Sequence, residues 1–291
     1  MMAREEKMST VLEVRNVCKN YNNFSLKNVS FCLEKGTITG FIGENGAGKT
    51  TTLSAIMNLI HTDSGEIYLR DKQVRKTQEM KGVSYLESNR DLYPDVMMDD
   101  YKYFVSQAYR KTWSEEKYQK YRRQFHIENA KKIKELSTGM KAKFYLAVEL
   151  AKQPELILLD EPTSGLDPLA RNELLEILKQ LVKEEHITIF FSSHITSDIE
   201  HIADRVVFIH NGEILLNKEK REICSNYKRL DISAIQNFTE KEMDCLKENG
   251  IKNFDYYIID QHQMKEIRVK NCKDASLDDV LMFLTGGVRV D

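Results

Sequence analysis

The sequence contains no long apolar run. A membrane-spanning helix needs about 20 consecutive apolar residues, and no segment of this kind occurs among the 291 residues. The first ten residues, MMAREEKMST, are charged and include no apolar segment of signal-peptide length, so we expect the chain to stay in the cytosol. Any role at a membrane then has to come through a partner.

Cysteine pairs and an excess of one charge are also missing. The five cysteines are scattered, odd in number and never spaced as CxxC, which is typical of a reducing compartment and disfavours a zinc site. The net charge of −2 gives no indication of a nucleic-acid-binding protein or of a polybasic membrane-surface protein. With 41% hydrophobic and 30% charged residues, the composition indicates a globular protein of one large domain, or of a large and a small one.

What the chain does have is a glycine-rich loop at residues 41–51, FIGENGAGKTT. The spacing Gly43-x-x-x-x-Gly48-Lys49-Thr50 matches loops whose backbone N–H groups cradle phosphates. Residues 37–42 predict a buried strand and residues 51–57 a helix, whose N-terminus adds positive potential to a phosphate site. The residues expected to bind nucleotide here are Gly43, Glu44, Asn45, Gly46, Ala47, Gly48, Lys49, Thr50 and Thr51.

Two acids end a second predicted strand, at residues 154–163, PELILLDEPT. Open α/β sheets bind ligands at the carboxyl ends of such strands. We predict that Asp160 holds Mg²⁺ together with Thr50, and that Glu161 orients or deprotonates an attacking water. Alternatively, both acids could be exposed to solvent at the end of the strand and have no role in catalysis. The phosphate loop in the same chain disfavours this alternative.

Three shorter motifs are weak alone. LSTGM, residues 136–140, precedes a helix expected from near Lys141, and by itself it predicts only a helix cap with Ser137 as the capping hydroxyl. Residues 187–194, ITIFFSSH, predict a strand that ends in His194, and a lone histidine is more often structural. The segment SGLD, residues 164–167, lies between them.

In this order, the motifs resemble those of ATP-binding cassette (ABC) ATPases over roughly residues 11–215. LSTGM resembles the family's LSGGQ signature, with Thr138 and Met140 departing from the strict form. SGLD is similar to the family's D-loop, and Ser-Ser-His to its switch histidine. The resemblance implies an α/β fold, a P-loop NTPase of the ABC ATPase type with a β-rich N-terminal subdomain, a helical subdomain and a small α+β C-terminal appendage.

The resemblance also implies partners and roles. ATP with Mg²⁺ would lie between the phosphate loop of one copy and Ser137 and Gly139 of a second ATP-binding subunit, in a homodimer or a related heterodimer. Lys49 would bind the terminal phosphates, and His194 would contact the last one. A multi-span membrane permease subunit would hold the chain at the inner face of the cell membrane. LSTGM looks like the variant in bacterial ABC-2 cassettes that export antibiotics or peptides.

A cassette ATPase without a transport role is the alternative. Translation factors of this kind usually carry two cassettes, whereas one phosphate loop occurs here. Repair ATPases insert a long coiled coil or a zinc hook, and neither sustained heptads nor CxxC occur between residues 51 and 136. A nucleotide-sensing regulator without turnover is disfavoured by Glu161.

Two further positions follow from the resemblance. Tyr21 stands where the family places an aromatic residue that stacks on adenine, although Phe24 is an alternative and either ring could belong to the core. Ser88 stands where the family normally has a glutamine that reaches Mg²⁺ or the attacking water. We expect this difference to affect coupling to the membrane subunit rather than ATP binding.

The predicted organisation has a loose extension at 1–10, an ATPase domain at 11–217 with its helical subdomain at about 88–140, and a small α+β domain at 218–291. Aromatics recur near helical spacing between 99 and 134, and most are expected to pack between helices. In the C-terminal part, residues 239–249 and 276–284 predict helices, and 254–260 and 264–270 predict paired strands. No catalytic constellation occurs there, so dimer or partner contacts are its expected role.

Overall fold

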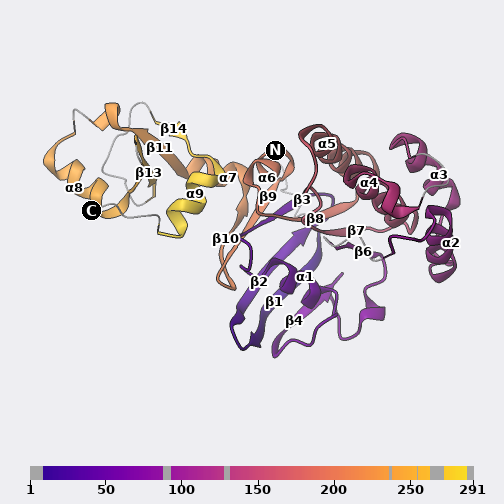
Figure 1. Cartoon of the computed structure of the whole chain (residues 1–291). Helices are drawn as coiled ribbons and strands as arrows, with labels where there is room; N and C mark the ends of the chain where they lie inside the picture. Colours follow the sequence, from indigo (N-terminus) through magenta and orange to yellow (C-terminus); the bar gives the residue numbers. More distant parts are fainter. Residues whose placement is uncertain are drawn as a thin grey trace, which may run out of the picture.

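The computed structural model describes residues 9–87, 93–127, 132–235, 238–253, 255–262 and 272–286. Its strands form three sheets, which Figure 1 shows with helices covering the central one and the C-terminal part to one side. Ser88 and the strand predicted at 264–270 lie outside the described residues.

The first sheet is antiparallel, with the strand order β2-β1-β4-β5. The bounds of its strands are β1 Thr10–Tyr21, β2 Phe24–Glu34, β4 Ser64–Leu69 and β5 Lys72–Gln73. β1 and β2 form a hairpin in which Tyr21 pairs with Phe24 at the turn. This hairpin therefore brings both candidate adenine-stacking rings to one place.

The second sheet has the order β10-β9-β3-β8-β7-β6 and is parallel except at β10. Its strands are β3 Ile38–Ile42, β6 Val83–Leu86, β7 Leu156–Asp160, β8 Thr188–Ser193, β9 Arg205–His210 and β10 Glu213–Glu219. Every residue of β3, β7 and β8 is buried, as expected for parallel strands covered on both faces. The strands predicted before the phosphate loop, at the acidic pair and before His194 are thereby confirmed, and the structure places them side by side in the order β3-β8-β7.

The helices between β3 and β9 are α1 Lys49–Ile56, α2 Met98–Ala108, α3 Glu115–Gln124, α4 Thr138–Ala151, α5 Pro168–Glu185 and α6 Thr196–Ile202, with short 3₁₀ turns at Thr77–Glu79 and Ile133–Glu135. Helices α1, α4, α5 and α6 contact strands of this sheet, whereas α2 and α3 lie beyond α4, on which α3 packs (Figure 1). Successive side chains of β7 enter different cores: Ile157 and Leu159 join the core that contains α4 and α5, whereas Leu156 and Leu158 join the one that contains the first sheet and α1. This alternation follows from the period-2 geometry of a strand.

The aromatics between residues 99 and 134 divide into two groups. Tyr118 and Tyr121 are buried, as the packing interpretation predicted, whereas Tyr103 and Phe104 are 64% and 70% exposed. The helix that was expected from near Lys141 begins earlier, at Thr138. The reason is local, because the Ser137 hydroxyl accepts the Met140 N–H and caps the helix.

The C-terminal part continues from β10 into α7 Lys220–Asn226 and a third sheet of order β12-β13-β11-β14. These strands are β11 Tyr227–Asp231, β12 Ile251–Asn253, β13 Tyr256–Asp260 and β14 Lys273–Asp274, with a 3₁₀ turn at Ile232–Ile235. The predicted helices are confirmed as α8 Glu240–Asn249 and α9 Leu277–Leu284, and each opens with a capping box. β13 matches the predicted strand, and its described partners are β11 and β12.

No helix within the described residues is both long and apolar enough to cross a bilayer. This agrees with the absence of long apolar runs from the sequence.

The turn between β9 and β10 connects the sheet to the phosphate loop. Gly212 in this turn donates its N–H to the Ala47 carbonyl at 3.0 Å and accepts from the Lys27 N–H at 2.8 Å. Its φ is +77°, and a Cβ at this position would lie 1.8 Å from the Ser25 carbonyl oxygen. Only glycine therefore allows this approach of the turn to β2.

Gly212→Ala should lower the free energy of unfolding by about 2–4 kcal/mol, because backbone strain and steric overlap act together. Urea denaturation followed by circular dichroism measures the change. Gly36→Ala is the matched control, since Gly36 has a φ of +71° but open space where the Cβ would lie. Equal losses for the two variants would show that the contact with Ser25 carries no cost.

Candidate nucleotide site

The phosphate loop joins the carboxyl end of β3 to the start of α1. Gly48, immediately before α1, has a φ of +114°, which side-chain-bearing residues rarely adopt. A Cβ here would also lie within 3 Å of the side chains of Leu26 and Phe24. As in any α-helix, the first N–H groups of α1 have no partner within the helix and are available to an anion.

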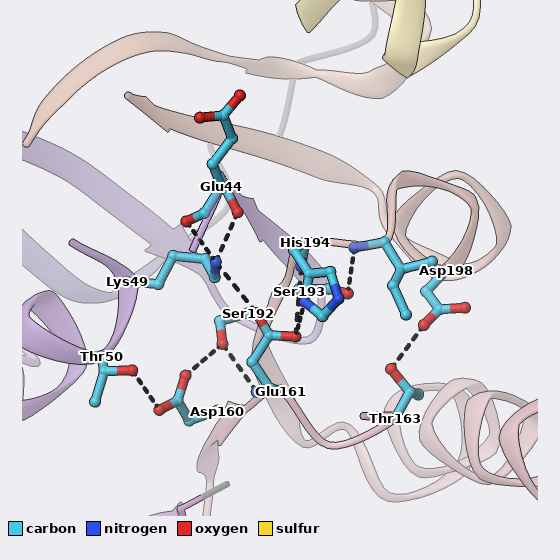
Figure 2. Close-up of polar contacts among 12 residues, drawn as sticks. Glu44, Lys49, Thr50, Asp160, Glu161, Thr163, Ser192, Ser193, His194 and Asp198 are labelled. Atoms are coloured by element: carbon cyan, nitrogen blue, oxygen red, sulfur yellow. Dashed lines mark hydrogen bonds and ion pairs between the residues drawn. The ribbon is translucent and has the colours of Figure 1, made fainter. Parts of the chain in front are cut away.

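Lys49 is the cation of this loop, and its side chain is only 6% exposed. Its ammonium group donates to the carbonyls of Gly43 at 2.6 Å and Glu44 at 3.0 Å. It also forms an ion pair with Glu161 Oε1 at 3.1 Å (Figure 2). In this structure, therefore, Glu161 supplies the negative charge that pairs with Lys49.

Asp160 ends β7 and is fully buried. One of its oxygens accepts from Thr50 Oγ1 at 2.8 Å and the other from Ser192 Oγ at 2.7 Å. The Ser192 oxygen in turn accepts the Glu161 N–H at 3.0 Å. Sequence reasoning missed Ser192; the indication available was its place in the buried strand that leads to His194.

These oxygens fit Mg²⁺ in a specific way. Mg²⁺ prefers hard oxygen ligands and is usually held by one or two carboxylates together with substrate phosphates and water. Thr50 and Asp160 present such oxygens beside the phosphate loop. Across the described part of the chain, no cluster of three or more histidines, cysteines and acids could hold a metal alone. Thr50 and Asp160 would hold Mg²⁺ together with phosphate oxygens of a bound nucleotide.

Glu161 follows Asp160 in a left-handed backbone conformation, with a φ of +47°. This strained conformation turns its side chain toward the phosphate loop and β8, so that Oε2 lies 2.8 Å from His194 Nδ1 while Oε1 faces Lys49. Figure 2 shows the carboxylate between the lysine and the histidine. Both oxygens of the predicted catalytic carboxylate are thus occupied by side chains of its own chain.

Tyr85 in β6 is partly buried and lies near Asp160. Burial raises the pKa of its phenol, and the negative charges of Asp160 and Glu87 raise that pKa further. The phenol is therefore neutral throughout the physiological pH range. Tyr85 therefore adds no second negative charge beside Asp160.

The two candidate adenine-stacking residues differ in their surroundings. Tyr21 is 48% exposed, with the Lys19 ammonium 5.4 Å from its ring centroid. The ring of Phe24 instead packs beside Gly48: a Cβ on Gly48 would lie only 2.8 Å from the Phe24 ring. Phe24 therefore supports the phosphate loop, whereas Tyr21 has a ring face available to a ligand. Stacking by Tyr21 stays a prediction.

The LSTGM segment lies apart from this bonded group. Ser137 is exposed and uses its hydroxyl to cap α4. Gly139 packs closely against α5, since a Cβ there would lie 3.0 Å from that of Ala170. The structure thus brings Lys49, Thr50, Asp160, Glu161 and His194 together and leaves Ser137 and Gly139 on another surface.

Comparisons with known proteins identify the family of the chain. A family profile described as ABC transporter matches residues 26–164. The linearmycin resistance ATP-binding protein LnrL of Bacillus subtilis is 35% identical over 74% of this chain and 71% of its own length. The bacitracin transport ATP-binding protein BcrA of Bacillus licheniformis is 29% identical over 96% of this chain and 99% of its own.

Among solved structures, an ATP-binding subunit of an ABC transporter superimposes with a TM-score of 0.66 at 28% identity. The match covers 74% of this chain and 92% of that protein. Together with the matching profile and relatives, this similarity confirms the expected fold. The chain belongs to the ABC transporter family, as an ATP-binding subunit that hydrolyses ATP.

Proposed function

We propose that this chain drives a bacterial ABC-2 exporter of an antibiotic or peptide, using the carboxylate of Glu161 to activate the attacking water. The observation that carries the proposal is the bonded group at the carboxyl ends of β3, β7 and β8, where Lys49, Glu161 and His194 meet. The names of two relatives, one for linearmycin resistance and one for bacitracin transport, support export over uptake.

The phosphate loop and Lys49 bind the phosphates of ATP. Backbone N–H groups at the start of α1 point at the phosphates, and the buried ammonium neutralises their charge. Thr50 and Asp160 would hold Mg²⁺ beside the bound nucleotide, and the metal would supply further neutralisation of the phosphate charge. Tyr21 stacks on the adenine ring.

Hydrolysis then depends on Glu161. The carboxylate orients a water and takes its proton while the water oxygen bonds to the terminal phosphorus and the bond to the bridging oxygen breaks. His194 contacts the terminal phosphate through its ring. Lys49 is paired with Glu161 in this structure. When the phosphates of ATP bind the Lys49 ammonium group instead, the carboxylate of Glu161 becomes free to orient and deprotonate the attacking water.

Subunits of this family work with membrane permeases and form dimers. In our proposal Ser137 and Gly139, which lie away from the phosphate loop of their own chain, complete the nucleotide site of a second subunit. The exposed hydroxyl of Ser137 and the free N–H groups at the start of α4 suit an anionic phosphate. The chain is accordingly cytoplasmic and peripheral on the inner face of the membrane, through its permease.

Purification of the tagged chain from detergent-solubilised cells tests this proposal. A multi-span membrane protein in a fixed ratio to the chain is expected, and ATP hydrolysis by the complex should respond to the exported compound. A chain released entirely without detergent and recovered with ribosomes or DNA-repair proteins would support the non-transport alternative instead.

A further inference from the structure

Helix α6 connects the catalytic segment to the C-terminal part of the chain. It begins at Thr196, two residues after His194. On one side it packs against β3 and β8, and on the other it contacts α9. Figure 1 shows α9 on the side of the C-terminal part that faces α6.

The contact between α6 and α9 is reciprocal. Asp278, in the first turn of α9, accepts a hydrogen bond of 2.7 Å from the hydroxyl of Thr196, the first residue of α6. In return, Glu200 of α6 accepts the N–H of Leu277, the first residue of α9. Each helix thus contributes an acid to the start of the other, where a negative charge is favourable.

External contacts matter to α6 because the helix is weak by itself. It has seven residues, and Ile195 at its N-cap position provides no side-chain hydrogen bond. Short helices without caps are marginal in water. The start of α6, and with it the adjacent His194, is therefore fixed by side chains that other elements supply.

A second contact of α6, through Asp198, connects the helix to the segment that carries Glu161. Asp198 is 3% exposed and pairs with Arg171 of α5, and it accepts from the Thr163 hydroxyl at 2.7 Å (Figure 2). Thr163 stands two residues after Glu161. α6 is consequently bound on one side to the Glu161 segment and on the other to α9.

We propose that Asp278 of the C-terminal part is a positioning residue for ATP hydrolysis: through Thr196 it fixes the start of α6 and thereby the place of His194 beside Glu161. This inference rests on the proposed role of His194 at the terminal phosphate. It gives the C-terminal part a direct effect on turnover in addition to partner contacts. Because nothing in the contact reaches the phosphate loop, ATP binding is unaffected.

Asp278→Ala in the full-length chain should lower kcat about three- to tenfold while KM for ATP changes less than about twofold. Asp278 is exposed, so we expect the variant to fold. Asp278→Asn keeps an oxygen that accepts from Thr196 and should restore most of kcat. Thr196→Val should match Asp278→Ala, and the double variant should be no slower than either, because both remove one hydrogen bond.

The matched control is Asp274→Ala. Asp274 lies in β14, is 69% exposed and pairs with Lys228 rather than with α6, so its removal makes the same chemical change without touching α6. Its kcat should equal that of the parent chain. Equal kcat values for Asp278→Ala and Asp274→Ala would overturn the proposal, as would a full additive loss in the Thr196→Val/Asp278→Ala double variant.

A spectroscopic readout separates this inference from the proposed function. The chain has seven histidines, and the imidazole NMR signal of His194 is the one that disappears in His194→Gln. This signal should shift in Asp278→Ala and stay in place in Asp274→Ala; an unmoved signal in both contradicts the link. If His194→Gln keeps full kcat, the role of His194 fails even where the signal shifts.

Discussion

Glu161→Gln should bind MgATP at least as tightly as the parent chain and hydrolyse it about 10²–10⁴-fold more slowly. The amide keeps the shape of the side chain but cannot take a proton from water, and a general base contributes a factor of this order. The substitution also removes the ion pair between Lys49 and Glu161 at 3.1 Å. The phosphates of ATP then no longer compete with a carboxylate for the Lys49 ammonium group. Steady-state ATPase and equilibrium binding of a fluorescent ATP analogue measure the two effects.

Glu155→Gln is the control for this variant. Glu155 lies just before β7, at the opposite end of the strand from Glu161, and pairs with Arg70 at 2.8 Å. Its neutralisation should leave turnover unchanged. A stable ATP-bound homodimer of Glu161→Gln is expected on gel filtration if two copies close on ATP. Persistence of monomer at saturating ATP would indicate an unlike partner subunit or no nucleotide-bridged dimer.

Lys49→Ala should weaken ATP binding by at least about 100-fold, which corresponds to about 2.7 kcal/mol, and abolish turnover. The substitution removes the buried ammonium that faces Gly43 and Glu161, and no other cation takes part in the hydrogen bonds described around the phosphate loop. Isothermal titration with ATP and Mg²⁺ gives the affinity.

Lys152→Ala separates the loss of phosphate binding from the loss of a lysine ion pair. Lys152 is 12% exposed and pairs with Glu149 within α4 and its C-cap, away from the phosphate loop. Its removal should lower stability without changing the affinity for ATP. Normal hydrolysis by Lys49→Ala would refute the assignment of the phosphate loop.

The elements that could be predicted from sequence are those with local causes. A loop of glycines followed by Lys49 and Thr50 is determined within ten residues, and apolar strands that end in Asp160 or His194 are equally local. The capping hydroxyl of Ser137 was also correctly identified, although its helix begins sooner than expected. Each of these follows from residue type and spacing alone.

The remaining features depend on contacts between distant segments. Nothing in the local sequence distinguishes Ser192 from other serines. Its role depends on the pairing of β7 with β8, which brings its hydroxyl to Asp160. Phe24 contacts the phosphate loop only because β2 passes beside it. Thr196 and Asp278 are separated by about eighty positions, and no periodicity relates them. Strand order and helix docking are global outcomes of packing, which local propensity does not specify.

The path of β10 bears on how this protein can be shortened. The strand runs through Glu219, past the position where the sequence placed a boundary, and its last residues, Lys218 and Glu219, pair with Val206 and Arg205 of β9. Ending the polypeptide at Asn217 would remove the last residues of β10 and their pairing with β9 at the edge of the central sheet. It would also remove Ile223, which is fully buried. A truncation after Asn226 keeps all of β10 and the buried Ile223, so it leaves the central sheet intact.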